Sequence, residues 1–190
     1  MNQSHIDFLS SPQWTKMLKE DLLPWLDAAG DLGDDVLEIG PGPGLTTDLL
    51  RTRIAHLTAV EIDPALAGPL RERLDGTNVE VVEGDAATCG FDSNRFSAVI
   101  CFSVLHHMPS PAHQDGVFAE LGRVLAPGGL FVGTDSLDNE LTRGGHEDDT
   151  FTPVDPGTLS NRLERAGLTL THLDQGEYQF RFVAAKGVGR

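Results

Sequence analysis

The sequence predicts a doubly wound α/β fold, in which a mostly parallel sheet carries helices on both faces. Five short apolar runs have the length and composition of buried strands: 36–39, 57–62, 79–82, 96–102 and 130–134. Segments with helical apolar spacing separate them, and strands that alternate with helices join through right-handed crossovers into a parallel sheet. Two last runs, 168–173 and 178–185, flank Gly176 and predict a hairpin, so one terminal strand runs antiparallel.

The segments between the strands carry signals for helix starts and stops. Ser11 can cap a first helix and Pro12 fits its first position, after which apolar residues recur at helical intervals as far as Trp25. Later helices are predicted at 45–54, 64–74 and 156–166, and a further helix carries apolar residues from Val117 to Leu125 and stops at 127–129. Residues 136–153 are polar and rich in Gly and Asp, so an irregular loop is expected there.

The chain length of 190 residues suits one domain with a full hydrophobic core. We expect an N-terminal helical segment, 1–34, followed by the main domain, 35–190. The N-terminal segment has two interpretations. It either packs as a helix on the domain, or it forms a lid over a ligand site with Trp14 or His5 facing the ligand.

The charge balance is strongly acidic. Fourteen Lys and Arg oppose 29 Asp and Glu, which gives a formal net charge of −15. An acidic surface repels phosphates, so we expect no nucleic-acid partner. Solubility alone explains the acidity equally well.

The sequence shows neither a membrane span nor a secretion signal. No apolar run approaches the roughly 18 residues that a membrane span needs, and residues 1–5 lack the basic and apolar regions of a signal peptide. We therefore expect no membrane association and a cytoplasmic location. Cys89 and Cys101 are then expected to be reduced, partly buried thiols rather than a disulfide.

A glycine-rich turn follows the first strand. Gly40, Gly42 and Gly44 stand between this strand and the helix that begins at Leu45. Such a turn places backbone N–H groups and the positive end of a helix beside a ligand, although glycine is also used there for steric reasons alone. Glu61 ends the second strand, 21 residues after Gly40, where a carboxylate can accept hydrogen bonds from ribose hydroxyls. Together these features predict a nucleotide-containing cofactor.

Other polar residues also follow strands. Asp85 comes after the third strand, and residues 102–107 end the fourth strand and continue beyond it. Ligands of doubly wound sheets bind at the carboxyl ends of the strands. All these residues should therefore meet at one edge of the sheet.

The glycine turn resembles that of the class I S-adenosylmethionine-dependent methyltransferases, particularly the small single-domain members. Glu38, Gly40, Gly42 and Gly44 match the family pattern acidic-x-Gly-x-Gly-x-Gly, and 121–129 resembles its late signature. A dinucleotide fingerprint needs glycine at position 45, where this chain has leucine. The resemblance extends over 36–185 and implies seven strands in the order 3-2-1-4-5-7-6, with strand 7 antiparallel.

The resemblance also implies roles for individual residues toward S-adenosyl-L-methionine. The turn at Gly40, Gly42 and Gly44 would line its methionine part. Glu38 would order that part through the amino group, with the Phe102 carbonyl at its border. In the absence of a ligand, Glu38 could instead be a satisfied carboxylate at a strand end.

The nucleoside part of the cofactor would contact the next two strand ends. Glu61 would take the ribose hydroxyls and Ile62 the adenine face, while Asp85 and the Ala86 amide would contact the adenine edge. Other readings remain for two of these residues. Glu61 could be a solvated loop charge, and Asp85 could cap the following turn.

The chemistry of a sulfonium methyl group requires little beyond in-line positioning of a nucleophile. A general base is needed only when the acceptor must lose a proton. His106 and His107 follow the fourth strand and are the candidate catalytic residues, unless they only shape the loop. His146 is a weaker candidate. Its sequence neighbours could bind a metal, but they show no recognised ligand spacing, so no metal is predicted.

The sequence analysis thus predicts methyl transfer to a small-molecule acceptor, with a protein side chain as a further option. The acceptor atom (O, N, S or C) and the oligomeric state are left open. Two alternatives remain: a non-catalytic cofactor-binding regulator or scaffold, and a nicotinamide-dependent oxidoreductase. Leu45 and the lack of a substrate domain disfavour the latter.

Overall fold

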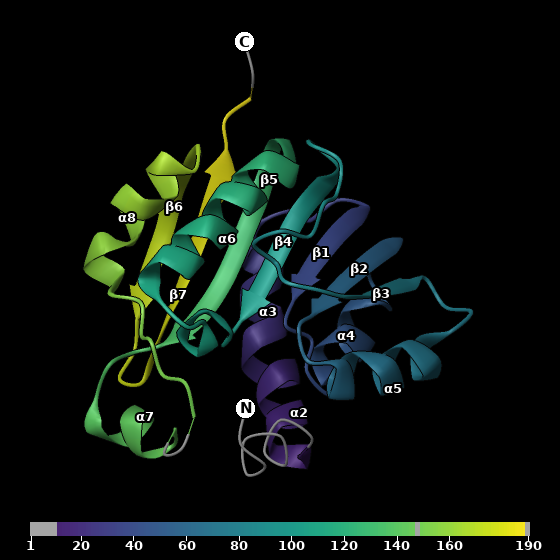
Figure 1. Cartoon of the computed structure of the whole chain (residues 1–190), viewed down its shortest axis with the longest axis horizontal. Coiled ribbons are helices and arrows are strands. Elements are labelled where there is room, and N and C mark those ends of the chain that lie inside the picture. The colour runs from purple at the N-terminus through teal and green to yellow at the C-terminus, as the bar shows by residue number, and fades with distance from the viewer. Residues whose placement is uncertain (1–10, 147–148, 189–190) are drawn as a thin grey trace.

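The computed structural model describes residues 11–146 and 149–188. Its centre is one sheet of seven strands in the order β3-β2-β1-β4-β5-β7-β6 (Figure 1). β7 runs antiparallel to both of its neighbours, and all other pairs are parallel. This confirms the predicted topology. The strands are β1 Asp35–Ile39, β2 His56–Glu61, β3 Val79–Glu83, β4 Phe96–Phe102, β5 Leu125–Ser136, β6 Leu168–Gln175 and β7 Gln179–Lys186.

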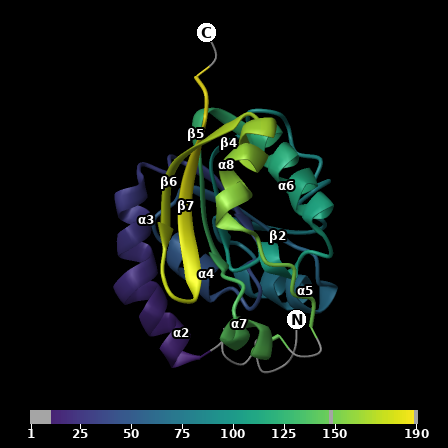
Figure 2. The ribbon, with the colours of Figure 1, turned by 90° about the vertical axis from the view of Figure 1, so that its left-hand side faces the viewer.

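Helices cover both faces of the sheet, and Figure 2 shows α2 and α3 on the side opposite α6 and α8. Alternate side chains of β1 pack on opposite faces of the sheet, because successive side chains of a strand point in opposite directions. Val36 packs with α3 and α4, whereas Leu37 joins the core beneath α6 and α8. The helical elements are α2 Pro12–Met17, η1 Leu18–Leu22, α3 Leu23–Ala29, α4 Leu45–Leu50, α5 Pro64–Leu74, η2 Leu105–His107, α6 Pro111–Val124, α7 Glu140–Gly144 and α8 Pro156–Arg165.

The N-terminal helix is interrupted by a π-helical turn. Ser11 caps it by accepting the Trp14 N–H at 3.1 Å, as predicted. Further on, the Leu23 N–H donates to the Leu18 carbonyl, five residues back. Pro24 has no N–H to donate, so the helical ladder is widened just before it.

The same helix packs on the sheet face beside α4. Trp14, Leu18 and Leu22 form an apolar cluster that also contacts Phe102 at the end of β4. An ion pair between Asp21 and Arg181 of β7 adds a polar contact. His5, named with Trp14 as a candidate lid residue, lies outside the described residues.

Several expectations about element boundaries were wrong. The stretch 136–153 is not wholly irregular, because α7 forms within it. Asn139 and Thr142 build a capping box in which each side chain accepts the other's backbone N–H. Helix α6 begins at Pro111, where Ser110 caps it, and it ends at Val124 instead of at 127–129, because 125–136 form β5.

None of the helices formed by residues 11–146 and 149–188 combines the length and the apolar content that a bilayer crossing requires.

Candidate active site

The carboxyl ends of β1, β2, β3 and β4 surround a pocket of about 230 Å³. Seven of the residues predicted from the sequence line it: Gly40, Glu61, Ile62, Asp85, Ala86, Phe102 and His107. Glu38, Gly42, Gly44 and His106 lie outside its lining. The strand ends thus meet at one edge, as the doubly wound topology requires.

The three glycines of the turn differ in what surrounds them. All have positive φ, at 65° for Gly40, 54° for Gly42 and 87° for Gly44. A Cβ at Gly40 would collide with Val104, and one at Gly44 with Leu70. A Cβ at Gly42 would meet nothing within 4 Å. Gly40 and Gly44 therefore permit close packing, whereas Gly42 leaves open space beside the turn.

Glu61 is buried and held by the backbone on both sides. Its Oε2 accepts the Gly42 N–H at 3.0 Å, and its Oε1 accepts the Asp63 N–H at 3.0 Å. With 5% of its surface exposed, Glu61 is not a solvated loop charge. Each oxygen keeps a lone pair with which it can accept from a ligand hydroxyl.

Glu38 is a buried carboxylate at the end of β1. It is 3% exposed, and its Oε2 has no hydrogen-bond partner among the described residues. Burial raises the pKa of Glu38 to about 7, because the charged form loses its hydration. A buried carboxylate with an unused oxygen suits a cationic group such as an amine.

Asp85 accepts the Ala87 N–H at 2.8 Å, as the turn-capping interpretation predicts. The same oxygen lies 3.2 Å from Nε2 of His113, which also lines the pocket. His113 stands in the first turn of α6. The sequence analysis missed it because it assigned no start to that helix.

Ser103 follows β4 in an uncommon conformation. Its φ is 59°, in the left-handed region that non-glycine residues seldom adopt. Its N–H donates to the Thr134 carbonyl of β5 at 2.8 Å, which holds it there. Ser103 and Val104, which precede His107 in the sequence, also line the pocket.

The two histidines of η2 have different surroundings. His106 is 1% exposed, and its Nδ1 lies 2.5 Å from Oδ1 of the fully buried Asp135. His107 lines the pocket, and its Nδ1 lies 3.9 Å from Oδ2 of Asp149. Asp135 was missed because β5 was expected to end before it.

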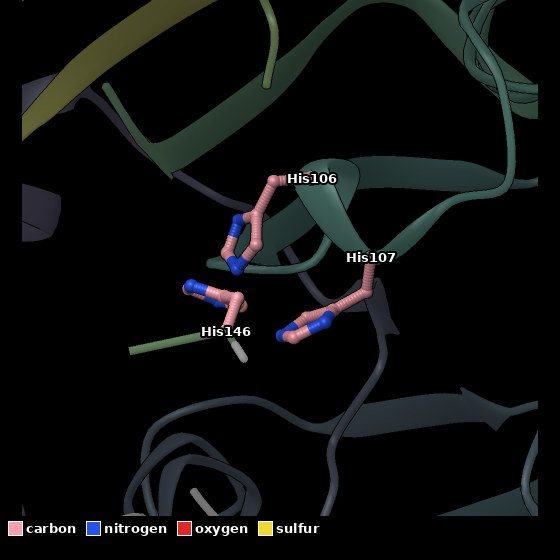
Figure 3. A group of neighbouring side chains, drawn as sticks. All are labelled: His106, His107 and His146. Carbon is pink, nitrogen blue, oxygen red and sulfur yellow. The ribbon is translucent and has the colours of Figure 1, made fainter. Parts of the chain in front are cut away.

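His146 joins these two histidines, as Figure 3 shows. Its ring centroid lies 4.8 Å from that of His106 and 5.2 Å from that of His107. The sequence analysis considered His146 with its chain neighbours alone, because nothing in the sequence indicates that α7 brings it to η2. We call His106, His107 and His146 the histidine cluster.

Buried hydrogen bonds tie the segment after His146 to η2. The Gln114 side chain of α6 donates to the carbonyls of Leu105, at 2.9 Å, and Thr152, at 2.8 Å. The Thr152 N–H donates to the His106 carbonyl at 2.7 Å. These bonds place Asp149 and Thr150 against the pocket, where both contribute to its lining.

Comparison with known proteins agrees with the fold. Residues 36–129 match a family model described as a methyltransferase domain. The ubiquinone biosynthesis O-methyltransferase of Azoarcus sp. (strain BH72) is 29% identical over 179 residues, which cover 82% of this chain and 73% of that protein. A structure from Pyrococcus horikoshii OT3 has a TM-score of 0.80 at 20% identity and covers 94% of this chain and 93% of that chain.

Another relative matches a shorter stretch. The probable ribosomal RNA small subunit methyltransferase A of Thermococcus onnurineus (strain NA1) is 48% identical over 58 residues. That match covers 30% of this chain and 21% of the relative. The expectation that this chain has no nucleic-acid partner stays a prediction.

The sheet order, the acidic glycine turn and the family match define the class of protein. The chain belongs to the class I S-adenosylmethionine-dependent methyltransferases. It is a methyltransferase, and its cofactor is S-adenosyl-L-methionine. The unused oxygen of Glu38, the held carboxylate of Glu61 and the open space at Gly42 fit this cofactor.

Proposed function

We propose that this enzyme transfers the methyl group of S-adenosylmethionine to a small-molecule acceptor by in-line displacement at the sulfonium methyl carbon. The observation that carries the proposal is the pocket at the sheet edge. Its lining includes the carboxylates of Glu61 and Asp85, which suit the cofactor, and also His107. When bound, the cofactor supplies a methyl carbon made electrophilic by its sulfonium. The chain's own residues then have to bind the cofactor and the acceptor, orient them for in-line attack, and exclude water.

The cofactor-side residues are already oriented. Two backbone amides fix the Glu61 carboxylate, so it can accept from ribose hydroxyls without losing further side-chain entropy. Glu38 would bind the amino group in its ionised form, because a cation compensates the charge that burial disfavours. Ile62 is 66% exposed at the pocket rim, where it offers an apolar face to the adenine ring.

The adenine edge and the methionine part meet the remaining predicted residues. Asp85 and Ala86 line the wall after β3, and Phe102 lines the wall after β4. The backbone at Gly40, Gly42 and Gly44 borders the methionine part. Gly42 leaves the space through which the ligand approaches.

A small acceptor is favoured by the form of the pocket and by charge. The pocket has a volume of about 230 Å³, and Asp149 and Thr150 line it together with His107. The net charge of −15 opposes a polyphosphate partner. A protein side chain that reaches into the pocket is the second acceptor class to test. The relative named as a ubiquinone biosynthesis O-methyltransferase matches 82% of this chain, which also supports a small acceptor.

The acceptor's proton is the remaining chemical requirement. We retain His106 and His107 as the candidate catalytic residues. His107 lines the pocket and can contact an acceptor, whereas His106 is buried behind it against Asp135. An acceptor that loses a proton would therefore meet the histidine cluster through His107.

We also propose that 1–34 is an N-terminal helical segment with a lid as one option, that 35–190 forms the cofactor-binding domain, and that the enzyme works in the cytoplasm without a membrane partner. The apolar cluster of Trp14, Leu18 and Leu22 packs against Phe102, which also lines the pocket, and this joins the helical segment to the site. Motion of this helix would be transmitted to the pocket wall through that contact.

The test is a turnover screen of purified enzyme with S-adenosylmethionine and a panel of phenols, catechols, amines and thiols. Ribosomal RNA and a mixed protein substrate are assayed in parallel, and release of S-adenosylhomocysteine is measured. We expect turnover with at least one small acceptor and none with RNA. Methylation confined to RNA or to protein would overturn the small-molecule assignment.

A further inference from the structure

We propose that the histidine cluster is a binding site for a divalent transition-metal ion of the zinc type. His106, His107 and His146 each offer one ring nitrogen, and these atoms lie within 4.8 Å of one another. Figure 3 shows the three rings converging, with one nitrogen of His106 pointing toward the other two rings. They come from η2 and from the end of α7, which are distant in the sequence.

His106 provides the strongest evidence. Its Nδ1 lies 2.5 Å from the Asp135 carboxylate, which can only accept, so this nitrogen carries a proton. Its Nε2 is buried and has no hydrogen-bond partner among residues 11–146 and 149–188. A buried polar atom left without a partner is costly. A metal ion bound at Nε2 would remove that cost.

His146 repeats this arrangement. Its Nδ1 lies 2.6 Å from the Thr142 carbonyl, which also only accepts, so Nδ1 is the protonated nitrogen and Nε2 carries the lone pair. Metal-binding histidines typically donate the second ring N–H to a carboxylate or a backbone carbonyl, which fixes the tautomer and the ring orientation. His106 with Asp135 shows the first form, and His146 with Thr142 shows the second.

The charges near the cluster also suit a cation. Three protonated imidazoles at these distances would repel one another. When the rings are neutral, each of the three histidines offers one ring nitrogen within 4.8 Å of the others, where a single cation can accept their lone pairs. The fully buried carboxylate of Asp135 and the carboxylate of Asp149, 3.9 Å from His107, supply compensating negative charge.

The donor atoms select the kind of ion. Imidazole nitrogens suit zinc and its neighbours, whereas Mg²⁺ and Ca²⁺ prefer oxygen ligands. Tetrahedral zinc with bonds of about 2.0–2.1 Å needs nitrogens about 3.3 Å apart, so the rings would draw together slightly on binding. His146 follows the last turn of the short helix α7, where such an adjustment is easy.

Three protein ligands leave a fourth coordination position, as in catalytic zinc sites. His107 lines the methyl-transfer pocket, so this position would face the acceptor side. We infer that it takes the hydroxyl oxygen of the acceptor, whose proton passes to water as the oxygen binds the ion. This second step rests on the proposed function. It makes His106 and His107 metal ligands rather than free bases.

The experiment is a titration of chelator-treated protein with Zn²⁺ and with Co²⁺, followed by calorimetry and by visible absorption. Four proteins are compared: the wild type, His146→Phe, Asp135→Asn and His56→Gln. His146→Phe keeps a ring to stack on Phe151 but has no ligand nitrogen. His56 is exposed at the start of β2 and serves as the control.

We expect the wild type and His56→Gln to bind about one Zn²⁺ per chain and to give the visible bands of four-coordinate Co²⁺. Asp135→Asn should weaken binding about 10–100-fold, and His146→Phe at least as much. Zn²⁺ should raise the thermal midpoint of the wild type and of His56→Gln but not that of His146→Phe. Circular dichroism checks that each variant is folded.

Equal Zn²⁺ affinity in all four proteins, or no binding by the wild type, would overturn the site. The titration needs neither acceptor nor cofactor, so its result is independent of the proposed function. Full turnover of an active enzyme after chelation would overturn the catalytic step alone.

Discussion

The Glu61 carboxylate accepts the backbone N–H of Gly42 at 3.0 Å and thereby joins the end of β2 to the turn after β1. One side chain thus fixes the turn that we propose to border the methionine part of the cofactor, and the same carboxylate is the proposed acceptor for the ribose. The two functions are coupled, because the lone pairs that remain on Glu61 are oriented by the bonds that it already makes.

Glu61→Ala should weaken both cofactor binding and the fold. Removal of the carboxylate leaves the N–H groups of Gly42 and Asp63 without their acceptor, which should cost about 1–3 kcal/mol of stability. Cofactor affinity should fall by a further ~1.5–3 kcal/mol through loss of the ribose contact. Thermal unfolding and calorimetry with S-adenosylhomocysteine measure the two effects. Glu83→Ala, at the exposed end of β3, is the control. Unchanged affinity in Glu61→Ala would place the ribose elsewhere.

Gly42→Val should abolish cofactor binding in a folded protein, because the branched side chain fills the space that the ligand needs. Gly42 has a φ of 54°, so the substitution also strains the backbone. Gly76→Val is a matched control: Gly76 has a φ of 71° and open surroundings, but it lies in the turn between α5 and β3 and not in the glycine turn after β1. We expect both variants to lose similar stability, by about 1–2 kcal/mol. Only Gly42→Val should lose binding of S-adenosylhomocysteine in calorimetry. Equal affinity in both variants would contradict this assignment.

Cofactor affinity should rise as the pH increases through about 7. Burial raises the pKa of Glu38 from 4.5 to about 7, so the free enzyme holds this carboxyl protonated in mild acid. The amino group of the cofactor favours the ionised form, and at lower pH binding must first release the proton. Calorimetry on either side of neutrality tests this, and Glu38→Gln should flatten the profile. An equally steep profile in Glu38→Gln would assign the effect to another group.

The Glu38 carboxyl also makes the free energy of unfolding depend on pH, and this quantity falls as the pH rises, whereas cofactor affinity increases. Its folded-state pKa lies above the unfolded value, so its contribution is fully present below pH 4.5 and is lost as the pH rises through about 7. The loss should approach about 3 kcal/mol in the free enzyme. It should shrink when the cofactor is bound, because the amino group stabilises the carboxylate. Denaturant unfolding at several pH values, with and without S-adenosylhomocysteine, measures both changes.

The sequence predicts the sheet well because its central strands are buried on both faces and appear as continuous apolar runs. β4, from Phe96 to Phe102, is the clearest example. The sheet-edge residues follow from the same reasoning, since Gly40, Glu61 and Asp85 each lie at the end of a strand or within two residues of it. These positions depend on chain order and parallel topology alone.

The histidine cluster could not be predicted in this way. The contact of His146 with His106 depends on the path of α7, which is set by the Asn139–Thr142 capping box and by the bonds of Gln114 to the neighbouring segment. These are tertiary contacts between residues far apart in the sequence. Asp135 was hidden for a simpler reason: its strand extends beyond the apolar run that marked it.

Substitution of the two η2 histidines should have unequal effects. His106→Asn removes the partner of the buried Asp135 and should cost about 1–3 kcal/mol of stability besides lowering turnover. His107→Asn should lower turnover roughly 10²–10⁴-fold with little change in stability or in cofactor affinity, because His107 faces the pocket. His113→Asn is the control for His107, since it also lines the pocket but lies against Asp85 on the adenine side. It should change cofactor affinity more than turnover.

Chelation then separates the two roles of His107: a free base works without metal, whereas a metal ligand loses turnover on chelation and regains it with Zn²⁺. Wild-type turnover in both single Asn variants and in the double variant would exclude both roles.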